Sequence, residues 1–170
     1  WSLEGRGRPG WDPEPGLRRA AALWWFWHCR GRQDEGIYWL ELLLEGEQEE
    51  RADRPLTPER TRCRARALFV AAWLTMLNIE TTKSRKFSEE SRELYRSLGA
   101  DGRVGYAYGT VLFYIDRRSF PTESIRLMDE CQAIFQEAGD RSGLADCFAV
   151  RGDIAAIHKE YQKAKDLLDE

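Results

Sequence analysis

The residue types that most often carry enzyme chemistry are sparse in this chain. Its two histidines, His28 and His158, have no carboxylate or cysteine at a recognised metal or triad spacing. Cys29 follows His28, but adjacent residues of a helix point about 100° apart, which disfavours joint ligation. No phosphate-binding loop, G-x-S-x-G or H-E-x-x-H motif occurs. We therefore expect no catalytic residues, no metal and no cofactor, and do not expect an enzyme.

The cysteines also lack a pattern that indicates chemistry. None of the four lies in a Cys-x-x-Cys pair, so neither a structural zinc site nor a disulfide framework is expected. The four residues are Cys29, Cys63, Cys131 and Cys147. Free thiols without a pairing pattern are typical of a reducing compartment, and we expect a cytoplasmic protein.

The charge distribution gives no sign of a nucleic-acid or membrane partner. The 170-residue chain has a formal net charge of −3, so no overall positive field attracts phosphate groups. A helical series of alternate arginines runs from Arg60 to Arg66, and a spacing of two spreads such side chains around a helix. No apolar run is long enough to span a bilayer. We expect no direct nucleic-acid contact and no membrane contact.

Hydrophobic spacing and helix start and stop signals predict an all-α protein. Asp12-Pro13 and Thr57-Pro58 each combine an N-cap residue with a proline suited to the first turn. No segment shows sustained two-residue alternation of β-branched residues. The predicted helices cover residues 12–30, 34–47, 57–78, 82–98, 103–117, 121–138, 141–158 and 161 onward.

A repeat organises these helices. The stretch Glu90–Gly99 returns 40 residues later as Glu130–Gly139, each with a large apolar pair followed by a terminal glycine. Such a segment is a helix that buries one stripe and ends at a residue able to adopt positive φ. We expect a linker or the end of an upstream helix at 1–12 and a helical repeat domain at 13–170. Its four units would be 13–50, 57–99, 102–139 and 141–170, and the chain would be a fragment of a longer protein.

The last unit resembles the tetratricopeptide repeat. Phe148-x-x-x-Gly152, then Tyr161 and Ala164, follow that family's order of bulky, small, aromatic and small positions. The period here is near 40 residues instead of the usual 34. The resemblance implies an α-solenoid: a right-handed superhelix of about four helical hairpins with a concave face.

A more specific resemblance covers nearly the whole chain. The stretches 16–31, 35–40 and 90–99 are similar to the repeat region of large bacterial regulators of the LuxR/MalT-like and AfsR-like class. In that family the repeats follow an ATPase-type nucleotide-binding module and often accompany a DNA-binding domain. The resemblance implies an ATP-dependent transcriptional regulator in which the repeats sense a ligand or bind a partner.

The aromatic run at 23–28, Leu-Trp-Trp-Phe-Trp-His, is the sharpest local feature. Four consecutive aromatic residues of a helix cannot all face one core, because each residue turns about 100°. By repeat register we place Trp24 and Trp27 between helices and Trp25 with His28 on the concave face. Equivalent positions of later units extend this face into a groove that becomes acidic in the fourth unit. The predicted groove residues are Trp25, His28, Phe69, Trp73, Met76, Tyr108, Leu112, Ile115, Asp146 and Asp153.

Two interpretations of these positions stay open. They suit an apolar groove for a peptide helix or a flat apolar ligand. They also suit packing against neighbouring helices or a domain upstream of Trp1, with Asp146 and Asp153 on a solvated helix face.

The favoured function is a non-catalytic sensor or interaction module of a bacterial signal-transducing regulator. Its partner would be a protein or peptide, including other domains of the parent chain. A stand-alone adaptor or co-chaperone-like scaffold that binds a peptide in its concave groove is the alternative. An accessory domain of an enzyme, with catalysis in flanking sequence, is a third.

Overall fold

The computed structural model describes residues 11–50, 57–78, 81–115 and 122–169, and every regular element in these ranges is helical. The prediction of an all-α protein is confirmed for this part of the chain. Most of the predicted linker at 1–12 lies outside the described residues. The helices are α1 (Glu14–Ala22), α2 (Trp24–Cys29), α3 (Gln33–Glu50), α4 (Pro58–Leu77), α5 (Thr81–Ser97), the 3-10 helix η1 (Gly99–Gly102), α6 (Arg103–Ile115), α7 (Thr122–Ala138), α8 (Arg141–Ile157) and α9 (Tyr161–Leu168).

Local sequence signals account for most helix boundaries. Thr57 caps α4, since its side-chain oxygen accepts a hydrogen bond from the N–H of Arg60 at 3.3 Å. The two glycines that end the repeated stretch have positive φ, +60° at Gly99 and +67° at Gly139, and so does Gly31 after α2, at +64°. An L residue with a Cβ is disfavoured in this conformation, which explains why the repeated stretch closes on glycine.

The first predicted helix differs from the structure in two respects. It is divided at Leu23 into α1 and α2, so the single helix predicted over 12–30 is wrong. It also begins at Glu14, with Pro13 in the cap position. The Asp12 carboxylate nevertheless accepts a hydrogen bond from the Glu14 N–H at 3.0 Å, so it satisfies one donor of the first turn as an N-cap would.

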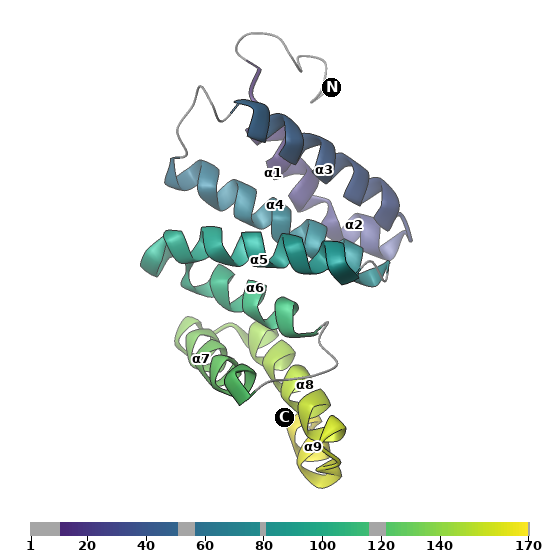
Figure 1. Ribbon diagram of the computed structural model, residues 1–170, viewed down its shortest axis with the longest axis vertical. Helices are drawn as coiled ribbons and strands as arrows, with labels where there is room; N and C mark the ends of the chain where they lie inside the picture. Colours follow the sequence, from purple (N-terminus) through teal and green to yellow (C-terminus); the bar gives the residue numbers. More distant parts are fainter. Residues whose placement is uncertain (1–10, 51–56, 79–80, 116–121, 170) are drawn as a thin grey trace.

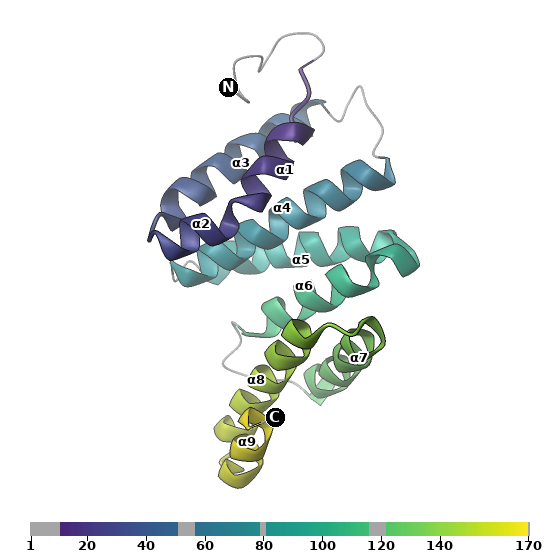
Figure 2. The same ribbon diagram turned by 180° about the vertical axis from the view of Figure 1, so that it is seen from behind.

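The helices follow one another along the long axis, with α1 to α3 at one end and α9 at the other (Figures 1 and 2). Helices α3, α5 and α7 each contact the helices before and after them in the chain. Helices α1, α4, α6 and α8 also contact one another in series, α1 with α4, α4 with α6 and α6 with α8. This second set of contacts builds one continuous face along four helical hairpins. The hairpins are α1 and α2 with α3, α4 with α5, α6 with α7, and α8 with α9.

The repeated stretch has the same structural role in both copies. Tyr95 of α5 lies over Gly105 of α6, where an added Cβ would come 2.4 Å from the ring. Phe135 of α7 lies over Gly143 of α8 in the same way, with 2.3 Å to an added Cβ. In each copy an aromatic ring of one helix thus occupies the space above a glycine of the next, which brings the two helices close together.

A buried ion pair joins the first two hairpins. Arg64 of α4 is only 4% exposed, and its Nη1 lies 2.5 Å from Oε2 of Glu47 in α3. Its Nη2 lies 2.6 Å from Oε1 of Glu90 in α5. Arg62, two residues earlier, is exposed and lies 3.6 Å from Asp101, so successive arginines of the series point to different sides of α4, as their spacing of two predicts.

No described helix combines the length and the hydropathy that crossing a membrane requires.

Candidate functional site

A hollow of about 490 Å³ lies on the face formed by α4, α6 and α8, with α2 at its border. Four of its lining residues belong to the predicted groove: Phe69, Trp73, Tyr108 and Asp146. The structure therefore brings together residues from three units that the register had placed on one face. The full lining is Trp24, Arg66, Phe69, Val70, Trp73, Tyr108, Ser142 and Asp146.

One stripe of α4 forms the floor. Arg66, Phe69, Val70 and Trp73 stand three, four and seven residues apart, so they share one side of the helix. Phe69 is partly buried against the core of the first two hairpins. The stripe therefore offers two large rings on a rigid, well-packed helix, with a cation at one end.

Tyr108 of α6 forms the wall towards α8. Its ring makes edge contacts with Phe69 and with Phe135, at centroid distances of 6.0 and 4.8 Å. Its hydroxyl donates a hydrogen bond to Oδ2 of Asp140 at 2.9 Å. Burial first, and then this hydrogen bond, raise the pKa of Tyr108 to about 12. The phenol is therefore a protonated, fixed part of the wall at neutral pH.

The aromatic run reaches the hollow through Trp24. The indole of Trp24 meets that of Trp73 edge-on at a centroid distance of 6.5 Å, and it meets that of Trp25 at 5.1 Å. The prediction that Trp27 lies between helices is confirmed, as its side chain is 4% exposed. Trp24 packs partly against the core of the first two hairpins, as predicted, and its remaining surface lines the hollow.

Two buried nitrogen atoms have no hydrogen-bond partner among the described residues. One is Nε1 of Trp73, in the lining. The other is Nδ1 of His28, a predicted groove residue that lies outside the lining, with its ring 5.3 Å from that of Trp25. A buried donor without an acceptor costs roughly 1–3 kcal/mol. The Trp73 N–H is itself buried, so a bound carbonyl oxygen would satisfy it only after the indole turned towards the hollow.

The lining carries two charges of opposite sign. Arg66 is exposed, and no ion pair joins it to another described residue. Asp146 is half-buried and likewise has no ion-pair partner in the described part of the chain. Burial, and then the nearby Asp140 carboxylate, raise the pKa of Asp146. An aromatic surface with one free charge of each sign is suited to binding a polar, amphipathic chain.

Two predicted groove residues occupy other environments. Leu112 is 2% exposed, so its assignment to the groove is wrong. Its helix, α6, is contacted by α4, α5, α7 and α8, which leaves little of its circumference open. Trp25 is 58% exposed and lies against His28, outside the lining of the hollow.

The remaining predicted positions also lie apart from the hollow. Met76 is half-buried and Asp153 is exposed, and neither contributes to the lining. The side chain of Ile115 lies outside the described residues.

Sequence reasoning missed Arg66, Val70 and Ser142. The first two could have been found, because they share the side of α4 on which Phe69 and Trp73 were already placed. Ser142 is an ordinary first-turn residue of α8, and only the approach of α8 to α6 brings it to the hollow. Its sequence neighbourhood contains no comparable signal.

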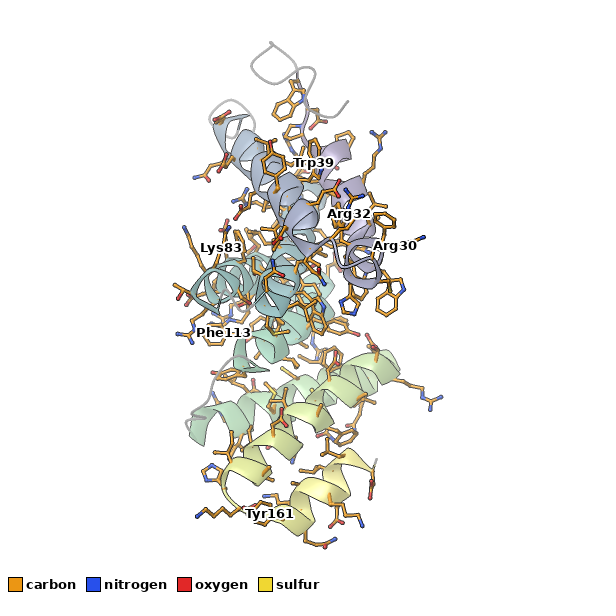
Figure 3. The ribbon with its side chains drawn as sticks, turned by 90° about the vertical axis from the view of Figure 1, so that its right-hand side faces the viewer. Arg30, Arg32, Trp39, Lys83, Phe113 and Tyr161 are labelled. Carbon is orange, nitrogen blue, oxygen red and sulfur yellow. The ribbon has the colours of Figure 1, made fainter. Side chains whose placement is uncertain are left out.

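A second hollow, of about 340 Å³, lies between the α1–α2 segment and α3. Three of its lining side chains are large, apolar and exposed: Leu23 at 48%, Phe26 at 45% and Trp39 at 38%. Figure 3 shows Trp39 near the N-terminal end of the array, far from Tyr161 at the other end. No groove was predicted here, although exposed apolar side chains of this size can mark a contact surface.

No protein-family model, curated protein or solved structure matches the chain. Among the described residues, no group of three or more His, Cys, Asp or Glu side chains could hold a metal ion. The site is thus defined by its geometry alone: a ring-lined hollow with an unsatisfied donor and two unpaired charges.

Proposed function

We propose that this protein is a non-catalytic interaction module, a tetratricopeptide-like right-handed superhelix whose hollow between α4, α6 and α8 binds a peptide segment of a partner protein. The single observation that carries this proposal is the hollow itself. Its volume of about 490 Å³ falls within the size of typical ligand sites, roughly 300–1,000 Å³.

The chemistry of the lining favours a peptide. Trp24, Phe69, Trp73 and Tyr108 supply apolar surface from side chains with few rotatable bonds, so little entropy is lost on binding. The surface also crosses three packed helices, and helical arrays use extended faces of this kind to bind chains.

The biological setting rests on the resemblance alone. We propose that the module belongs to a bacterial regulator, in which an occupied hollow changes how the array packs on a nucleotide-binding module. Sequencing the parent reading frame tests this setting. A phosphate-binding loop upstream and a DNA-binding motif at either end would support it, whereas their absence would leave the stand-alone adaptor.

Peptide binding itself can be tested without knowing the partner. A phage-displayed library of random 12-residue peptides is selected against the 170-residue chain, and the affinity of synthetic winners is measured by fluorescence anisotropy. We expect Phe69→Ala and Trp73→Ala each to weaken binding by about tenfold, as loss of a buried aromatic contact does. Failure to select any saturable binder, or binders unaffected by both substitutions, would overturn the proposal. Circular dichroism melts verify that each variant folds.

A further inference from the structure

We propose that the hollow receives a basic side chain, lysine or arginine, of the bound peptide and pairs it with Asp146. This inference rests on the proposed function, since it names the chemistry of the segment that the hollow would bind. It assigns the two ends of the hollow different tasks: the rings hold apolar groups, and the α8 end selects for positive charge.

The surroundings of Asp146 contain negative charge, and no described cation forms an ion pair with it. Asp140 lies close enough to raise the pKa of Asp146, and no basic group acts in the opposite direction. Elsewhere on α8 and α6, Arg151 pairs with Asp129 and Arg103 with Glu137, and Arg141 is exposed and outside the lining. Arg66, on α4, also lines the hollow but forms no ion pair with Asp146.

An uncompensated, half-buried carboxylate opposes folding, because burial removes water that would otherwise stabilise its charge. Such a group is a candidate binding residue when it lies in a hollow, since a ligand can then supply the missing counter-charge. Asp146 meets both conditions, because its carboxylate is half-buried without a counter-charge and it lines the hollow. Asp153, two turns later on α8, meets neither, because it is exposed and outside the lining.

The neighbouring rings suit a cation with an apolar stem. Phe69 and Tyr108 line the same hollow as Asp146, and aromatic faces attract ammonium and guanidinium groups within about 6 Å of the ring centre. The methylene groups of lysine or arginine would pack against this apolar surface while the charged end reaches the carboxylate. Glutamate or aspartate would have to place a third anion beside Asp146 and Asp140, which Coulomb repulsion disfavours.

The experiment uses the peptides selected from the 12-residue library. Each lysine or arginine of a winning peptide is replaced in turn by norleucine, which keeps an unbranched apolar chain and removes the charge. On the wild-type protein one such replacement should weaken binding by about tenfold, the usual effect of losing a hydrogen bond to a charged group. On Asp146→Asn the parent and norleucine peptides should bind alike. Asp153→Asn is the matched control and should behave as the wild type does.

Two results would overturn this inference and leave peptide binding intact. One is a set of winners without basic residues. The other is a norleucine effect of the same size on wild type and Asp146→Asn. A library that yields no binder would instead refute the proposed function, and with it this inference. Thermal melts of both asparagine variants establish that each is folded before its affinity is compared.

Discussion

The Tyr108 hydroxyl donates a hydrogen bond to Oδ2 of Asp140 at 2.9 Å, which joins the wall of the hollow to the start of α8. Oδ1 of the same carboxylate accepts the N–H of Gly143 at 3.1 Å and so caps the helix. One aspartate thereby fixes both the position of the ring and the first turn of α8. The shape of the hollow depends on this contact between α6 and α8.

Substituting Tyr108 and substituting Asp140 should lower the free energy of unfolding by different amounts. Tyr108→Phe deletes one hydrogen bond and should lower the free energy of unfolding by about 1 kcal/mol. Asp140→Ala also deletes the helix cap, worth about 1 kcal/mol more, and leaves the phenol without its acceptor. Urea unfolding of both variants measures the difference. Equal losses would show that the Asp140 cap adds nothing to the free energy of unfolding.

The buried ion pair of Arg64 predicts a large and specific loss of stability. Arg64→Ala removes the charged partner of Glu47, which is 3% exposed, and should cost about 3–5 kcal/mol. Arg62→Ala is the control: its exposed side chain lies 3.6 Å from Asp101, a surface pair worth about 0–1 kcal/mol. Chemical denaturation with urea gives both values. A loss for Arg64→Ala no greater than for Arg62→Ala would contradict this account of how the first hairpins are joined.

The contact between Phe135 and Gly143 can be tested in the same way. A Cβ at residue 143 would lie 2.3 Å from Cδ1 of a fully buried ring, so Gly143→Ala should cost about 1–3 kcal/mol. At Gly109 the nearest atom would be Cβ of Arg92 at 3.4 Å, an ordinary contact. Gly109→Ala should therefore be neutral or stabilise by about 0.5–1 kcal/mol, through its better helix propensity. A stabilising Gly143→Ala would show that the ring does not occupy this space.

The raised pKa of Asp146 gives the stability of the free protein a pH dependence of defined sign. The folded state binds this proton more tightly than the unfolded chain, so the free energy of unfolding falls as the pH rises through the raised pKa. Asp146→Asn removes this loss. We expect the free energy of unfolding of Asp146→Asn to increase relative to that of the wild type as the pH rises from the ordinary aspartate range, about 4, towards neutrality.

Urea unfolding at several pH values measures this gain, and Asp153→Asn is the control. Its exposed side chain should leave the pH profile of the wild type unchanged. Parallel profiles for Asp146→Asn and wild type would contradict the raised pKa.

Periodic and conformational signals allowed most of the helices to be predicted. The positive φ at Gly99 and Gly139 and the Thr57 cap follow from requirements within a single helix, which a sequence displays directly. The break at Leu23 was not predicted, since no glycine or proline marks it.

The site was predicted less completely, because its lining depends on how many helices cover each face. Phe69, Trp73 and Tyr108 were placed correctly beside one another by the register of the repeat. Leu112 stands at an equivalent register position, yet neighbouring helices bury it. Register fixes the side of a helix from which a residue projects, whereas exposure also depends on tertiary packing.

The central claim is that the hollow between α4, α6 and α8 is the binding surface, and two matched tryptophan substitutions test it most directly. Trp73 lines this hollow, whereas Trp39 lines the one between the α1–α2 segment and α3. The affinity of the tightest library peptide is measured by fluorescence anisotropy for wild type, Trp73→Ala and Trp39→Ala. We predict a loss of about tenfold or more for Trp73→Ala and less than about twofold for Trp39→Ala. The reverse order would place binding on the α1–α3 face and contradict the account.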